Sequence, residues 1–109
     1  MRRTIAAALA ASLVAAPAAA FDGTYGEVCE VVGDMAPVII EGDIITFYES
    51  ACQLTNPVSV RDMDGAVLFD MQCSGEGEVW TERVFLQPGW DGGLIFVSRG
   101  FAEMLPRCD

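Results

Sequence analysis

The chain of 109 residues contains no histidine and no lysine, so all six of its cations are arginines. Without an imidazole or an amine, the general bases of Ser–His, Cys–His and Ser–Lys hydrolases are missing. Four cysteines are present, but no two of them form a C-x-x-C pair, which disfavours both a thioredoxin-type redox site and a zinc site. We therefore expect no metal ion or other cofactor.

Cations are also scarce beside the 16 carboxylates, which give the chain a net charge of −10 at pH 7. Nucleic acids and anionic lipid surfaces are bound through Lys and Arg, so neither is an expected partner. A solvated acidic surface with no partner is the simplest interpretation of this charge. The same charge would attract a basic protein, which is the partner class that the sequence leaves open.

Carboxylates are the one acid–base option that remains, because glycoside hydrolases work with a pair of them. Glu76, Glu78 and Glu82 lie close together in the sequence. They fall in and just after a predicted turn, on a domain too small to hold a deep sugar cleft. We therefore do not predict an enzyme.

Residues 1–20 have the composition of a secretory signal peptide. Arg2 and Arg3 precede an Ala-rich apolar run and three consecutive alanines, which predicts cleavage before Phe21. The apolar run is too short and too rich in alanine to span about 30 Å of hydrocarbon, so we expect no membrane span after cleavage. Residues 21–109 are predicted to form one domain, periplasmic or secreted, with a net charge of −12 once the two arginines are removed.

An even number of cysteines in a short exported chain predicts two disulfides. Four cysteines allow three connectivities, of which we favour Cys52–Cys73 together with Cys29–Cys108. Cys52 and Cys73 fall at the same parity on predicted neighbouring strands, and the second bond would tie the two ends of the domain. On the chain-entropy model each bond would stabilise the fold by about 3–5 kcal/mol.

The clearest local pattern is a β-hairpin at residues 57–73, centred on Asp64-Gly65. This dipeptide suits a two-residue type I′ turn, which would pair Met63 with Ala66. In that register four apolar side chains share the inner face: Val58, Val60, Phe69 and Met71.

A second hairpin is predicted at residues 38–49, with Gly42-Asp43 as its turn and Ile40 opposite Ile45. Further strands are predicted at residues 50–56, 79–87 and 94–99, and Gly-rich turns separate them. No long helical period is present. Six or seven short strands in this order predict an all-β antiparallel meander, closed or partly closed into a small barrel, with a β-sandwich as the alternative.

Four short motifs occur in a recognisable order: YESAC at 48–52, MQCSGEGEVWTER at 71–83, DGGL at 91–94 and PRC at 106–108. This layout resembles that of small exported four-cysteine proteins of alphaproteobacteria. The resemblance covers most of the mature chain. It implies a β fold and disulfides, and it implies no activity.

Trp90 lies in a predicted turn, between Gly89 and Asp91. We favour the interpretation that its side chain folds back and caps the barrel end. The alternative is that it stays exposed and anchors a partner. Trp80, in the middle of a predicted strand, is expected in the core. The candidate partner-binding residues are Trp90, Asp91, Glu76 and Glu78.

The function that the sequence favours is that of an exported, inhibitor-like binding domain for a basic macromolecule. A small carrier for an apolar ligand is an alternative, and it would need an empty barrel interior. Phenylalanines at 47, 69, 85 and 96 are expected to fill that interior. A structural component of the cell envelope is a further alternative.

Overall fold

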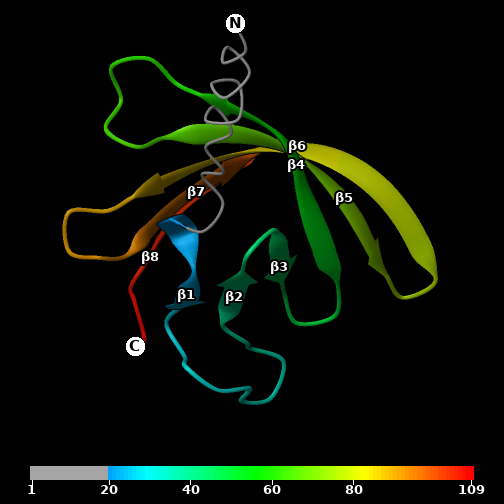
Figure 1. Ribbon diagram of the computed structural model, residues 1–109. Helices are drawn as coiled ribbons and strands as arrows, with labels where there is room; N and C mark the ends of the chain where they lie inside the picture. Colours follow the sequence, from blue (N-terminus) through cyan, green and yellow to red (C-terminus); the bar gives the residue numbers. More distant parts are fainter. Residues whose placement is uncertain (1–19) are drawn as a thin grey trace, which may run out of the picture.

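The computed structural model of the chain describes residues 20–109, so the expected signal peptide lies outside the described residues except for Ala20. In this part of the chain one antiparallel sheet of eight strands follows the sequence order (Figure 1). The count exceeds the predicted six or seven because both ends of the domain are strands. The strands are β1 (Gly23–Tyr25), β2 (Val38–Glu41), β3 (Ile44–Thr46), β4 (Ala51–Ser59), β5 (Val67–Gly75), β6 (Glu78–Pro88), β7 (Leu94–Ser98) and β8 (Phe101–Leu105).

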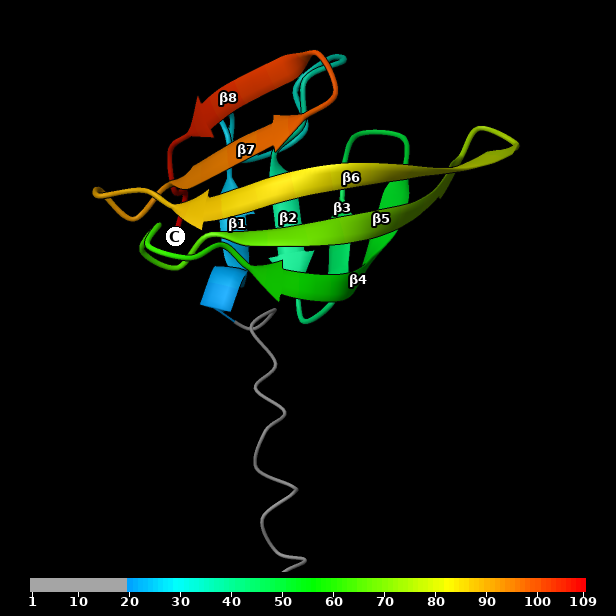
Figure 2. The same cartoon turned by 90° about the horizontal axis from the view of Figure 1, so that it is seen from above.

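The sheet curls until the chain segment after β8 lies against β1, and the result is a nearly closed barrel (Figure 2). Two backbone hydrogen bonds join the two sides, from Gly26 N–H to the Pro106 carbonyl at 2.9 Å and from Cys108 N–H to the Thr24 carbonyl at 2.8 Å. The predicted meander is therefore confirmed, and it forms one curved sheet.

Both predicted disulfides are present among the described residues. Cys29 joins Cys108 across 79 residues, and Cys52 joins Cys73 across 21 residues. Cys52 lies directly opposite Cys73 on β4 and β5, with their Cα atoms 3.9 Å apart. Two disulfides indicate an oxidising compartment. Residues 20–109 contain no helix long and apolar enough to cross a membrane.

The barrel interior is filled by apolar side chains from most of the strands. Val67, Phe69, Met71 and Cys73 alternate along β5, and all four are buried. This is the period of two expected for a strand with one face on a core. The rings pack edge to face, with centroids 6.2 Å apart for Phe21–Phe69 and 5.9 Å apart for Phe47–Phe96. Of the four expected phenylalanines, Phe85 alone lies outside, because it pairs with Leu68 on the outer face of the sheet.

The hairpin predicted at residues 38–49 is confirmed in its register. Ile40 lies opposite Ile45, and both are fully buried. Gly42, with a φ of 62°, begins the two-residue turn that joins β2 and β3. This register depends on a tight turn and on the alternation beside it, so local sequence was sufficient to predict it.

The register predicted for residues 57–73 is wrong. Val58 lies opposite Leu68 instead of Met71, and its side chain is 58% exposed. Val60 is outside the strands, and its N–H donates to the Ala66 carbonyl at 2.9 Å. Residues 60–66 thus form a loop much longer than a two-residue turn.

Two features of β4 and its loop explain the error. Asp62 adopts a φ of 62°, which turns the chain before Asp64-Gly65 is reached. A bulge between Thr55 and Val58, with Asn56 at a φ of 53°, shifts the register again and places Cys52 opposite Cys73. The side chain of Asn56 donates to Asp70 Oδ2 at 2.9 Å, so a contact with β5 supports the bulge.

Candidate partner-binding site

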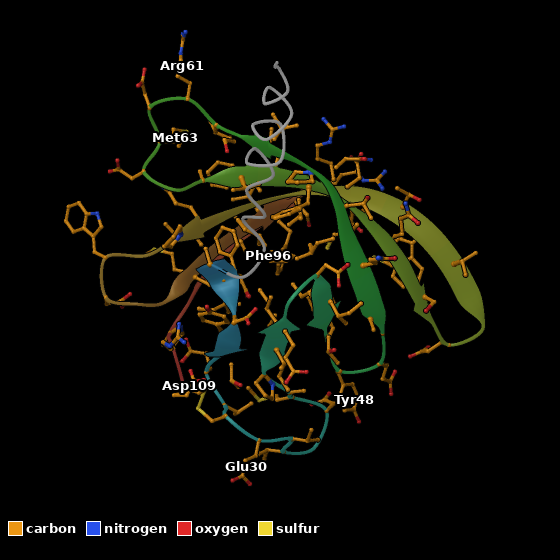
Figure 3. The ribbon with its side chains drawn as sticks, in the orientation of Figure 1. Glu30, Tyr48, Arg61, Met63, Phe96 and Asp109 are labelled. Atoms are coloured by element: carbon orange, nitrogen blue, oxygen red, sulfur yellow. A yellow bond between two sulfur atoms is a disulfide. The ribbon has the colours of Figure 1, made fainter. Side chains whose placement is uncertain are left out.

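The β4–β5 loop (residues 60–66) and the β6–β7 loop (residues 89–93) meet at one end of the long strands, which we call the loop end. In both views the two loops lie on the same side of the barrel (Figures 1 and 2). The amide of Gln87 donates to the Met63 carbonyl at 3.3 Å, and a Cβ at Gly65 would be 3.4 Å from the ring of Pro88. Figure 3 shows Arg61 and Met63 at this end, and Glu30 and Tyr48 at the bottom of the view, away from it.

Trp90 is at the tip of the β6–β7 loop and is fully exposed, with a relative accessible area of 104%. The expectation that it caps the barrel is therefore wrong. The loop backbone beneath it is held by hydrogen bonds from Gly89 N–H to the Gly93 carbonyl at 2.8 Å and from Gly92 N–H to the Gly89 carbonyl at 3.1 Å. Asp91 contributes a third, since its Oδ1 accepts from Gly93 N–H at 2.9 Å. The indole thus projects into solvent from an ordered turn.

The β4–β5 loop adds an exposed methionine and two more carboxylates to the loop end. Met63 is 41% exposed between Asp62 and Asp64, and both aspartates have positive φ values. Arg61 lies 3.8 Å from Asp62, with both side chains almost fully exposed, so this ion pair contributes little. Sequence reasoning missed Met63 because it placed the residue at the end of a strand. An apolar residue flanked by two aspartates was the available signal.

Glu76 and Glu78 are not part of the loop end. They lie at the β5–β6 turn, and the whole of β6, 11 residues, separates them from Trp90. At about 3.3 Å per step, the ten steps from Glu78 to Pro88 span about 33 Å along the strand. The four candidate residues therefore form two separate groups, one at each end of β6.

At the far end of β6, the two glutamates line a shallow pocket with Glu49 and Trp80. The hydrogen bond with Glu76, and then the negative charge of Glu76, raise the pKa of the Glu49 carboxyl above its usual value. Trp80 is 38% exposed, so its predicted place in the core is wrong. Its cross-strand partner Cys73 is buried, so Trp80 stands at the point along β6 where the packed interior ends.

Among the described residues no charged side chain is buried, and no three Asp, Glu or Cys side chains are grouped so as to hold a metal ion. What the loop end does present is an aromatic and a methionine among aspartates. Such a surface is suited to recognition of a macromolecule.

Comparison of the chain with protein-family models, with curated proteins and with solved structures found no match.

Proposed function

We propose that the protein is an exported binding domain without enzymatic activity, and that its partner is a basic protein. The observation that carries this proposal is the fully exposed indole of Trp90 on an ordered loop among carboxylates. A large aromatic side chain is the commonest kind of binding hot spot. An ordered loop lowers the entropy that is lost on binding.

The charge of the domain supports a cationic partner. With 16 carboxylates against four arginines after signal cleavage, the surface attracts positive charge and repels nucleic acids and anionic membranes. The two loops of the loop end carry three aspartates and one arginine, Arg61, which is itself beside Asp62. Binding should therefore be fast at low salt and should weaken as salt is added.

The carrier alternative receives no support from the barrel interior. Phe69, Phe96 and the side chains packed around them occupy the space that an apolar ligand would need. A relationship to the small exported four-cysteine proteins is part of the proposal, on the strength of the motif order alone.

The proposal is tested with the processed protein, immobilised and exposed to purified lysozymes and cationic serine proteases at 20 and 300 mM salt. Acidic proteins of similar size serve as the negative panel. We expect at least one basic protein to bind at low salt, and Trp90→Ala to weaken that binding at least tenfold. Val79→Ala is the matched control, because Val79 is also highly exposed but lies at the other end of β6. Equal binding by wild type and Trp90→Ala, or no binding to any basic protein, would refute the proposal.

A further inference from the structure

The barrel is closed along only part of its seam. Tyr25 pairs with Arg107, and the hydrogen bonds of Gly26 and Cys108 close the seam over the last residues of the chain. Beside β8 itself the seam is open. β8 is the last strand of the sheet, and in the described residues no strand lies on its outer side. The seam is thus closed beside residues 106–108 and open beside β8.

The Cys29–Cys108 disulfide explains why β1 does not continue along β8. If the pairing of Tyr25 with Arg107 continued, Cys29 would lie opposite Glu103, five residues away from Cys108. Five residues of strand span about 16 Å. The Cα atoms of Cys29 and Cys108 are only 5.7 Å apart, so the chain must turn back after Gly26 instead of extending along β8. The disulfide therefore keeps this half of the seam open.

The open edge presents backbone groups ready for pairing. A two-residue turn joins β7 to β8, so Ser98 and Phe101 form the hydrogen-bonded closing pair. Alternation then places Ala102 and Met104 in non-bonded pairs, with their N–H and C=O groups pointing away from β7. Pro106 and Cys108 have the same parity, and they bond to β1 on this side. Ala102 and Met104 continue the row where, among the described residues, no strand is present to pair with them.

A groove of about 360 Å³ runs along this edge, between β8 and the segment that follows β1. Its apolar walls include Met35 and Tyr48 on one side and Met104 on the other, and all three side chains are well exposed. Methionine side chains adapt to varied apolar partners. The rim is acidic and is formed by Glu27, Asp34 and Glu103.

The position of Glu103 determines which charge a segment bound in the groove should carry. It lies opposite the buried Phe96, so its carboxylate is on the inner face of an edge strand. An inward-facing charge of this kind opposes pairing with a like strand, and a second copy would bring the same carboxylate against it. An added strand with basic side chains would instead satisfy Glu103 and the rest of the acidic rim.

We propose that the open edge of β8 binds an extended, basic segment of a partner protein as an added ninth strand, with an apolar side chain of that segment seated between Tyr48 and Met104. Edge strands with a pocket beside them are a recurrent site of peptide recognition. The inference rests on the proposed function only in the basic charge of the partner, because the surface is separate from Trp90.

The test uses the processed protein labelled with ¹⁵N and a blocked heptapeptide of alternating Lys and Val. We expect the peptide to slow hydrogen exchange of the Ala102 and Met104 amides at least tenfold at saturation. A peptide with Glu in place of Lys, and a basic peptide methylated on alternate backbone nitrogens, should both fail to do so. Glu103→Gln should weaken binding about fivefold, the effect of losing one exposed ion pair. Glu41→Gln, which removes an exposed carboxylate on β2, is the matched control and should bind as the wild type does.

Several outcomes would overturn the inference. Protection by the acidic peptide would contradict the charge argument, and protection by the methylated peptide would contradict strand addition. Protection without peptide that rises with protein concentration would show that a second copy occupies the edge. Protection only in a chain that retains residues 1–20 would assign the edge to that segment. The Trp90→Ala variant should retain peptide binding. The experiment can therefore refute the proposal for the β8 edge without refuting the proposal for the loop end, and the reverse.

Discussion

Removal of the Cys29–Cys108 disulfide should destabilise the domain globally and open the seam locally. Cys29→Ser combined with Cys108→Ser deletes the bond with little loss of packing, because Cys29 is exposed and Cys108 is half-buried. The two cysteines connect the segment after β1 to the end of the chain, where the barrel closes. The change therefore removes the covalent closure of the barrel while the interior stays intact.

The magnitude follows from the length of chain that the bond closes. For a separation of 79 residues the chain-entropy model gives about 4.5 kcal/mol at 25 °C. For the 21 residues between Cys52 and Cys73 it gives about 3.3 kcal/mol. Small domains are stable by only about 5–15 kcal/mol, so loss of the longer closure removes a large share of the total.

Two measurements separate the global effect from the local one. Guanidinium unfolding should show a fall in the free energy of unfolding of about 4.5 kcal/mol. Native-state hydrogen exchange should show the amides of Gly26 and residue 108 exchanging through a local opening of the seam. The amide of Val84, in the centre of the sheet, should still exchange only through global unfolding.

A fall of less than about 2 kcal/mol would refute the loop-closure reasoning. So would unchanged protection at Gly26 and residue 108, because it would show that backbone pairing alone closes the seam. Cys52→Ala combined with Cys73→Ala is the comparison variant. This variant keeps the Cys29–Cys108 bond that closes the barrel, so the amide of Gly26 should still exchange only through global unfolding.

Four further outcomes are expected. Arg107→Ala should lower stability by about 2–3 kcal/mol, because the guanidinium donates to the Tyr25 hydroxyl at 3.3 Å and lies over its ring, and thermal unfolding measures this. Burial raises the pKa of Tyr25, so stability should be fully present below pH 10 and fall as pH rises through the folded-state pKa, which absorbance at 295 nm follows. Glu76→Gln should lower the pKa of Glu49 in a carboxyl NMR titration, because it removes the carboxyl–carboxyl hydrogen bond and then the charge that raise that pKa. Gly75→Ala should lower stability by about 1–3 kcal/mol in the same thermal assay, because its Cβ would be 2.5 Å from the Glu49 carbonyl oxygen.

Each of these has a control and a contrary result. For Arg107, the Lys variant retains the charge but loses the fork of donors, and full stability in the Ala variant would contradict the role given to the guanidinium. A Tyr25 that ionises at 10.0, the ordinary pKa of a tyrosine side chain, would contradict the effect assigned to its burial. A raised carboxyl pKa means that the folded state retains its proton as pH rises. An unchanged Glu49 titration in Glu76→Gln would show that Glu76 does not cause this rise. Gly77→Ala, where nothing lies within 4 Å, isolates backbone strain from steric clash.

Both the confirmed and the wrong predictions follow from how far apart the deciding residues lie. The pairing of Ile40 with Ile45 was predictable because the turn at Gly42 and the alternation beside it agree. The pairing of Val58 was not, since β4 projects past β3 and no core contact requires its side chain to face inward. The sequence also identified Trp90 as a turn residue, but its local pattern does not say whether the ring turns inward or outward, and the structure places it fully in solvent.

By itself, the sequence determined most of the strand content, the order of the meander, one hairpin register and the presence of two disulfides, because turn chemistry, side-chain alternation and cysteine number do not depend on distant contacts. Only the tertiary structure decided the bulge in β4, the contact between the β4–β5 loop and the end of β6, and the half-open seam beside β8. Each of these depends on contacts between segments distant in sequence, above all the bond between Cys29 and Cys108, and their energies are invisible to local pattern.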